Sequence, residues 1–182
     1  LYLSHMIKIF DLSDCREWDA IVRSFANYDV YYLSGYVRAF AIHGDGEPVL
    51  VCHESERGRA ICVLMIRDVA DDPLFKGRIP AGKYRDAVTP YGYGGFVFEG
   101  DTDKTLLSEE LISALKENGI ISVFFRFHPV LANATPFTDA LDVIPLGKTI
   151  ALDLESADTI WANITSKNRN VIRKAEKSGV VI

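Results

Sequence analysis

Two apolar runs on either side of a short polar turn constrain the fold of this chain more than any other feature. The runs cover residues 48–54 and 59–69, and the sequence Ser-Glu-Arg-Gly lies between them at residues 55–58. Strand-forming residues around a short turn that ends in glycine are typical of a β-hairpin. The chain is therefore expected to contain antiparallel sheet.

The residues before the hairpin predict a short strand at 7–12 and then two helices. Asp11 or Ser13 can cap the first helix, and Ser34 can cap the second. The apolar residues that recur at helical spacing are Trp18, Ile21, Val22 and Phe25 in the first helix, and Val37, Phe40 and Ala41 in the second.

After the hairpin, residues 70–86 are rich in Asp, Pro, Gly and Lys and predict an exposed loop. Residues 103–118 predict a helix, and the run at 120–127 is so apolar that we expect a central strand. A short helix at 132–141 and a strand at 148–154 follow. The order of strands and helices predicts an α+β fold.

The last part of the chain, residues 167–182, has the pattern of a basic amphipathic helix, a glycine stop and the start of a strand. Arg169, Arg173 and Lys177 recur every four residues and form a cationic ridge, while Lys167 and Lys174 form a second basic row. The apolar side consists of Ile160, Trp161, Ile164, Val171, Ile172 and Ala175. One interpretation is a solvated helix face; the other is a surface for an anionic ligand or nucleic acid.

The pattern K-x-R-x-x-x-R-K-A-x-K-x-G-V at residues 167–180 resembles a segment of the Fem-type peptidoglycan-bridge aminoacyltransferases and their acetyltransferase-like relatives in the GNAT superfamily. In that family the segment closes one GNAT-like domain and leads into a second. The resemblance implies a GNAT-like domain at residues 7–155, with a mixed central sheet flanked by helices. It also implies that the basic helix of residues 156–182 leads into a second GNAT-like domain outside this chain. Residues 1–6 resemble a tag remnant.

A glycine- and tyrosine-rich stretch at residues 87–98 is the other unusual segment. Its glycines permit close backbone approach, and Tyr91 and Tyr93 bring rings and hydroxyl groups to the same place. A bulged strand with glycines for packing is one interpretation, and a substrate-lining loop is the other. In the Fem-type enzymes a similar stretch lies beside the cleft for the cell-wall precursor, which makes Tyr91, Tyr93 and Asp101 candidate binding residues.

Composition limits the classes of function. The net charge of -5 argues against a generally nucleic-acid-binding surface, so any basic site must be local. No apolar run approaches the 18 or more residues of a membrane span. The odd number of cysteines, without metal spacing, predicts reduced thiols in a cytoplasmic protein; they are Cys15, Cys52 and Cys62.

The sequence contains no recognisable catalytic centre. The GNAT turn that binds the pyrophosphate of acyl-CoA, Arg/Gln-x-x-Gly-x-Gly/Ala at a helix start, is missing. No serine or cysteine lies in a nucleophile elbow, and no metal cluster is present. His43, His53 and His128 are scattered, and we interpret them as strand-end or surface residues. We expect no catalytic residue, cofactor or metal in this part of the protein.

Two functions remain. The resemblance implies the amino-terminal half of an aminoacyl- or acyltransferase that acts on an amine acceptor such as a muropeptide. The donor of the complete protein would be acyl-CoA or aminoacyl-tRNA, and this fragment alone would be inactive. Lys167, Arg169 and Arg173 would bind the anionic precursor, because guanidinium and ammonium groups match phosphate, with Tyr91 and Tyr93 behind them. The alternative is a non-catalytic binding module whose basic helix docks an anionic ligand or partner.

Overall fold

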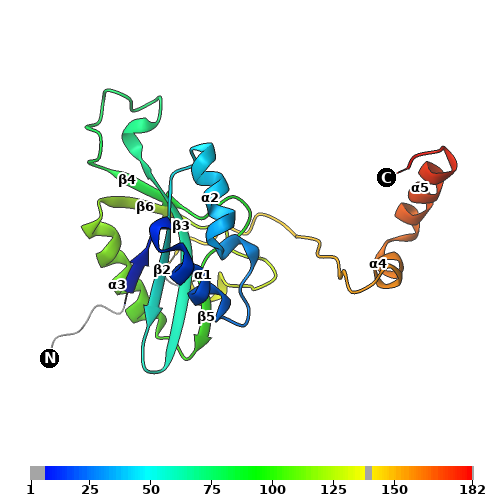
Figure 1. The fold of residues 1–182 in the computed structure, drawn as a ribbon, viewed down its shortest axis with the longest axis horizontal. Coiled ribbons are helices and arrows are strands. Elements are labelled where there is room, and N and C mark those ends of the chain that lie inside the picture. The colour runs from blue at the N-terminus through cyan, green and yellow to red at the C-terminus, as the bar shows by residue number, and fades with distance from the viewer. Residues whose placement is uncertain (1–6, 138–140, 182) are drawn as a thin grey trace. The chain divides into compact units, whose positions relative to one another are not determined.

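A mixed β-sheet is the centre of the first of two compact units, Leu1–Ile144 and Pro145–Ile182 (Figure 1). The computed structural model describes residues 7–137 and 141–181. Among them the sheet order is β1-β2-β3-β4-β6, with β5 also paired to β3. The strands are β1 Ile7–Phe10, β2 Glu47–Glu54, β3 Gly58–Asp68, β4 Arg85–Val88, β5 Val97–Gly100 and β6 Ile120–Phe124. β4 and β6 pair in parallel, and the other described pairs are antiparallel.

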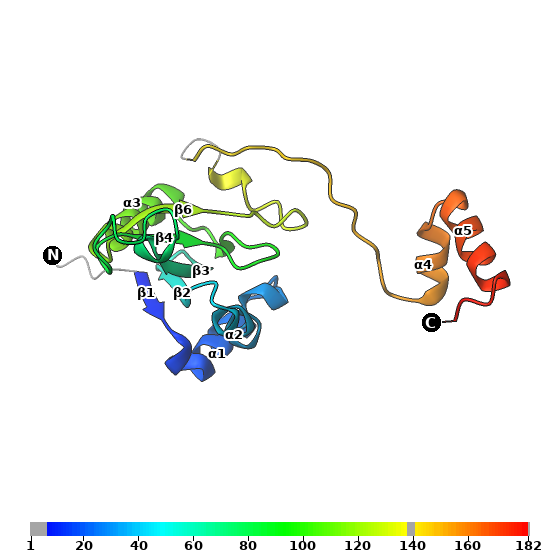
Figure 2. The same ribbon diagram turned by 90° about the horizontal axis from the view of Figure 1, so that it is seen from above.

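Helices cover both faces of this sheet, which confirms the predicted α+β class. Figure 2 shows α1, Cys15–Arg23, and α2, Ser34–His43, together on one side, and α3, Lys104–Glu117, on the other. In β3, Ile61, Val63 and Met65 belong to the core beside α1 and α2, whereas Cys62 and Leu64 belong to the core beside α3. The strand is continuously apolar because both of its faces are buried.

Local signals explain most element boundaries. The predicted hairpin is present, with Glu54 opposite Arg59. The Asp11 carboxylate accepts a hydrogen bond from the Ser13 N–H at the start of a short 3-10 turn, Leu12–Asp14, which leads into α1. The prediction that Ser34 caps α2 is wrong. Its side chain makes no capping bond, and its backbone N–H instead donates to the Asp19 carboxylate.

We expected the apolar run at 120–127 to form a central strand. It instead contains β6, which is an edge strand of the described sheet. The aromatic residues at the end of this run are partly covered by other aromatic side chains instead of by a second neighbouring strand. Phe125 stacks on Phe127 with ring centroids 5.5 Å apart, and Phe137 lies 6.3 Å from Phe127. This aromatic packing involves residues that follow β6, whereas within β6 Ile121 and Phe124 remain 63% and 57% exposed.

Three further expectations are revised. The helix predicted at 132–141 is reduced to a 3-10 turn at Thr135–Phe137, and residues 138–140 lie outside the described part. No strand is described at 148–154, where Ile150 is 87% exposed, because an alternating apolar pattern forms a strand only beside a hydrogen-bonding neighbour. The predicted loop at 70–86 contains the start of β4 and is fixed by Asp68, which accepts N–H groups from Ala70 and Gly82.

The second unit contains two helices, α4, Ala157–Asn163, and α5, Ser166–Lys177. Ser156 caps α4 through the Thr159 N–H, and the chain breaks between the two helices at Thr165. Neither helix contains a fully buried residue. The strand expected from residue 180 is not described at residues 180–181, and residue 182 lies outside the described range, as does the predicted tag remnant at residues 1–6.

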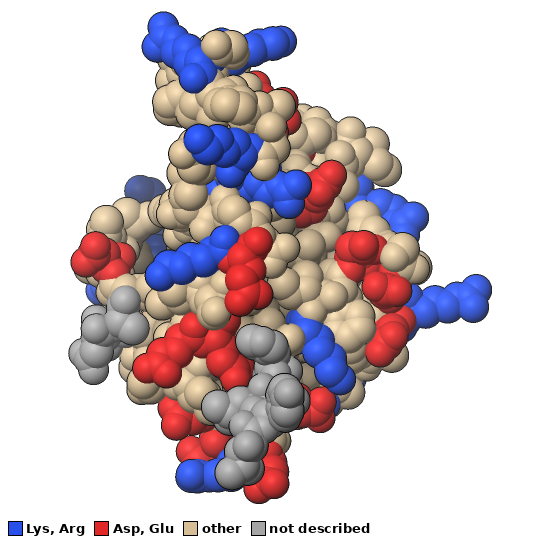
Figure 3. All heavy atoms as spheres, turned by 90° about the vertical axis from the view of Figure 1, so that its left-hand side faces the viewer, with Lys and Arg blue, Asp and Glu red and all other residues tan. Residues whose placement is uncertain are grey.

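Charge is mixed on the face of the molecule that Figure 3 shows, where Lys and Arg side chains lie among Asp and Glu side chains. This agrees with the expectation that any basic site is local. Within the described ranges no helix has the length and apolar character that a membrane span requires.

Candidate functional site

The glycine- and tyrosine-rich stretch interrupts a strand. β4 and β5 pair with the two ends of β3, at Met65↔Val88 and at Ile61↔Val97. β3 continues through residues 62–64 between these pairs, whereas residues 89–96 leave the sheet as a loop. This loop follows the carboxyl end of β4 and lies beside the segment that follows β6, since Gly94 bridges to Phe127. We call residues 89–96 the tyrosine loop.

Side chains from other parts of the unit hold the tyrosine loop by its backbone carbonyls. The Tyr36 hydroxyl donates to the Tyr91 carbonyl at 2.9 Å. The Asn133 amide donates to the carbonyls of Gly94 at 2.8 Å and Phe96 at 3.1 Å. Tyr32 adds a hydrogen bond to the Gly95 carbonyl. These hydrogen bonds therefore hold the backbone of the loop in a defined conformation.

Two glycines in the loop are required by close contacts. Gly92 has φ +99°, and a Cβ there would lie 2.4 Å from the Tyr31 ring. Gly95 has φ +88°, and a Cβ there would lie 2.8 Å from Phe127. Residues other than glycine rarely adopt such φ values, and at both positions there is no space for a Cβ atom. The packing interpretation thus explains these glycines, while the exposed Tyr91 needs a separate explanation.

The two predicted tyrosines differ in position. Tyr93 is half-buried in a three-ring cluster in which its ring centroid lies 5.9 Å from that of Tyr31 and 5.5 Å from that of His128. Tyr91 is 72% exposed, with the Phe40 ring 6.1 Å away. Asp101 lies beyond the far end of β5 and pairs with Arg57, so it is not part of this cluster. Tyr91 presents a free ring on a fixed backbone.

His128 is buried in this cluster. It is therefore not a surface residue, which was one of the two interpretations of its position in the sequence. Its Nδ1 accepts the Leu131 N–H at 3.3 Å, so in the neutral imidazole the proton belongs to Nε2. Nε2 lies 3.1 Å from the Asp29 carboxylate and donates to it. Both ring nitrogens are occupied, which leaves none to accept a proton from a substrate.

The basic helix forms a separate candidate site in the second unit. The Arg169 guanidinium donates to the carbonyls of Trp161, Ala162 and Ile164, the last at 2.5 Å, and so satisfies the carboxyl end of α4. The Arg173 guanidinium lies 5.3 Å from the centre of the Trp161 ring. Two members of the predicted ridge therefore hold α4 against α5.

The second basic row of α5 remains open to solvent. Lys167 and Lys174 are exposed, and Val171 between them is 60% exposed. No ion pair of either lysine is recorded within the described residues. The predicted binding residue Lys167 is thus available to a ligand. Lys174, which the sequence did not single out as a binding residue, is equally available.

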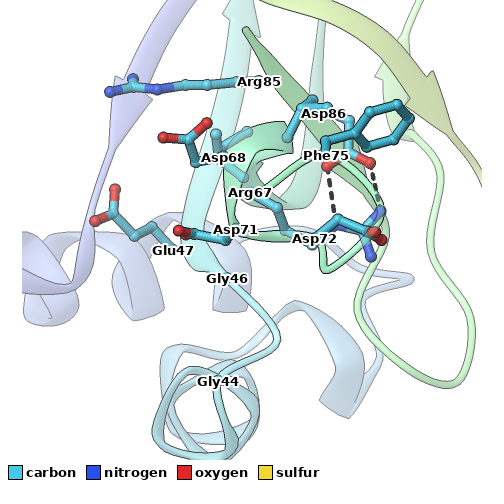
Figure 4. A pocket seen from close by; sticks show the side chains of 12 residues that line it. Gly44, Gly46, Glu47, Arg67, Asp68, Asp71, Asp72, Phe75, Arg85 and Asp86 are labelled. Carbon is cyan, nitrogen blue, oxygen red and sulfur yellow. Dashed lines mark hydrogen bonds and ion pairs between the residues drawn. The ribbon is translucent and has the colours of Figure 1, made fainter. Parts of the chain in front are cut away.

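The first unit also has a pocket of about 520 Å³ that the sequence did not reveal (Figure 4). It lies at the start of β2, the end of β3 and the start of β4. Its charged lining consists of Glu47, Asp68, Asp71, Asp72 and Asp86 with Arg67 and Arg85. Arg67 forms a double hydrogen bond with Asp86, and backbone N–H groups lower the pKa of Asp68. Carboxylates outnumber guanidinium groups, so this pocket opposes an anionic ligand.

The start of α3 is occupied by a side chain of the protein itself. Asp103 precedes α3, and its carboxylate accepts the N–H groups of Thr105 and Leu106. A carboxylate at this position repels a phosphate that would need the same donors. The tyrosine loop runs into β5 and opens no helix. Among the described residues, no group of three or more His, Cys, Asp or Glu side chains is arranged to hold a metal ion.

Comparison with known proteins adds no relative. No protein-family model matches the chain, and no curated protein or solved structure does so.

Proposed function

We propose that this chain is the amino-terminal, acceptor-binding half of a Fem-like N-acyltransferase with a GNAT-like fold. The complete protein would transfer an aminoacyl or acyl group from aminoacyl-tRNA or acyl-CoA to an amine such as that of a muropeptide. The amine nitrogen forms the new amide bond, and the tRNA hydroxyl or the CoA thiol leaves with the proton. The order of elements as far as β6, and a mixed sheet covered by helices on both faces, support this proposal.

The tyrosine loop is the observation that carries the proposal. It lies at the carboxyl ends of the parallel strands β4 and β6, and ligands of sheets with parallel strands bind outside those ends. Tyr91 offers an exposed ring there, on a backbone that Tyr36 holds in place. A backbone that is already held in place has less conformational entropy to lose when a ligand stacks on the ring that it carries.

Donor binding is assigned to a second GNAT-like domain outside this chain. Asp103 occupies the start of α3, where a pyrophosphate would otherwise find free N–H groups. His128 has no free ring nitrogen for the acceptor amine. The part played by this half is therefore to hold and orient the acceptor. We place the reaction in the cytoplasm, where the free thiols of Cys15, Cys52 and Cys62 stay reduced.

Calorimetric titration of the whole chain with a UDP-linked muropeptide tests this function. We expect saturable binding that Tyr91→Ala weakens about fivefold, the effect of losing one aromatic contact of about 1 kcal/mol. Tyr28→Ala is the matched control, because Tyr28 is also exposed but lies outside the loop. Absence of saturable heat with the wild-type chain, or equal affinity of the Tyr91 variant, would contradict acceptor binding at the tyrosine loop.

A non-catalytic binding module remains the second candidate. The exposed row of Lys167 and Lys174 favours it, because this row needs no donor, acceptor or catalytic group. The same titration separates the two functions. Muropeptide binding that survives replacement of both lysines supports the acyltransferase, whereas binding of anionic partners without muropeptide binding supports the module.

A further inference from the structure

The exposed side of α5 combines charge with apolar surface. Lys167, Val171 and Lys174 are spaced i, i+4 and i+7, so they lie along one side of the helix. Arg169 and Arg173 lie on another side, where they contact α4. The helix contains five basic residues and one acidic residue, Glu176. The free side therefore carries positive charge around an uncovered valine.

This combination distinguishes between anionic partners. A nucleic-acid backbone would be attracted by the lysines but would gain nothing from a valine between them. A lipid surface has phosphate groups above an apolar layer, and it can bind both. The surface thus has the composition of a segment that lies in a membrane interface.

We propose that the row of Lys167, Val171 and Lys174 docks on anionic lipid headgroups, and that Arg169 is a positioning residue which holds α4 against α5. The lysine ammonium groups contact lipid phosphates, and Val171 enters the boundary between headgroups and acyl chains. This peripheral contact does not involve the tyrosine loop, which carries the proposed acceptor binding. It uses residues of the second unit only.

Sedimentation of the whole chain with lipid vesicles tests the lysines. We expect the chain to bind vesicles of mixed phosphatidylcholine and phosphatidylglycerol, to ignore pure phosphatidylcholine, and to dissociate as salt is raised. Each lysine near an anionic surface strengthens binding about fivefold, so Lys167→Gln/Lys174→Gln should lower the partition coefficient about 25-fold. Lys76→Gln/Lys116→Gln removes the same charge from exposed positions of the first unit and should leave binding unchanged.

Val171→Gln separates the lipid proposal from simple charge attraction. It should weaken binding to anionic vesicles severalfold while leaving net charge the same. A parallel titration with transfer RNA provides the opposing outcome. Binding to RNA through the two lysines without binding to vesicles overturns the lipid proposal, and so does equal vesicle binding by the lysine pair variant and its control.

Arg169 is tested by amide hydrogen exchange of residues 157–177. Arg169→Ala should raise exchange in both helices, because the carbonyls at the end of α4 lose their partner, and Arg169→Lys should restore protection only in part. The lysine variants should leave exchange unchanged. If Arg169→Ala instead keeps full protection and loses vesicle binding, Arg169 is a lipid contact and its positioning role is wrong.

Discussion

His128 and Asp29 are 99 positions apart in the chain, yet the imidazole Nε2 lies 3.1 Å from the Asp29 carboxylate. The same carboxylate accepts the Val30 N–H, so Asp29 joins the segment after α1 to the segment after β6. Because Tyr93 packs against the His128 ring, this pair also supports the tyrosine loop.

Asp29→Ala should therefore destabilise the first unit by about 2 kcal/mol, since the buried Nε2–H loses its acceptor. Urea denaturation measures the loss, and imidazole nitrogen NMR checks whether Nε2 remains the protonated nitrogen. Asp71→Ala is the control, because Asp71 is exposed, and it should change stability by less than about 0.5 kcal/mol. Equal stability of the two variants would show that the pair does not support the loop.

Gly95→Ala should cost at least about 2 kcal/mol, because it combines a left-handed backbone with a contact of 2.8 Å to Phe127. Gly82→Ala isolates the backbone contribution. Gly82 has φ +75°, but nothing lies within 4 Å of its Cβ position, so its cost should be about 1 kcal/mol. Both values come from chemical denaturation, and a Gly95 variant as stable as the Gly82 variant would mean that the loop can move away from Phe127.

His53 and Glu110 form a poorly satisfied polar pair between β2 and α3. Their nearest nitrogen and oxygen are 3.6 Å apart, and both His53 ring nitrogens are buried without a hydrogen bond in the described structure. Replacing both residues by leucine should raise the free energy of unfolding by about 1–3 kcal/mol, because no polar group is then left unpaired. Thermal and urea unfolding test this, with each single variant for comparison. A less stable double variant would show that the pair is better satisfied in solution.

Thiol chemistry should differ sharply among the cysteines. Burial, followed by the charge of Glu54, raises the pKa of the Cys52 thiol to about 12, and burial also raises the pKa of Cys62. At pH 8, maleimide should therefore label Cys15 first, and the other two only after unfolding. Because the pKa of folded Cys52 lies above its ordinary value, its contribution to stability is present below about pH 9 and is lost as pH rises toward 12. Fast labelling of a Cys15→Ser variant under native conditions would contradict this.

The fold was predictable where the signal was local. The hairpin of β2 and β3 and the helix α3 depend on residues close together in the chain, and the sequence predicts both of them. The edge position of β6 and the missing strand at 148–154 depend on which segments meet in space. Apolar patterning shows that a segment must be covered, but not by what.

The candidate site was predictable only in part. Tyr91, Tyr93 and Lys167 could be proposed because their segments resemble those of the Fem-type enzymes and carry aromatic or basic side chains. The supporting residues could not, since Asn133 reaches the loop across 39 positions and His128 reaches Asp29 across 99. Arg169 has a structural role that its spacing did not reveal. The spacing predicts a ligand contact, which stays a prediction, and in the structure its guanidinium donates to carbonyls at the end of α4.

Residues outside the tyrosine loop hold its backbone, so the conformation of the loop does not depend on the Tyr91 side chain. Its path is set by Tyr32, Tyr36 and Asn133, none of which belongs to the loop, while the Tyr91 side chain contributes little to that path. Exchanging Tyr91 for other residues would then change what the surface recognises without changing where the backbone runs. Position 91 should therefore tolerate many residue types. A combinatorial library at this position could alter specificity while the fold is preserved.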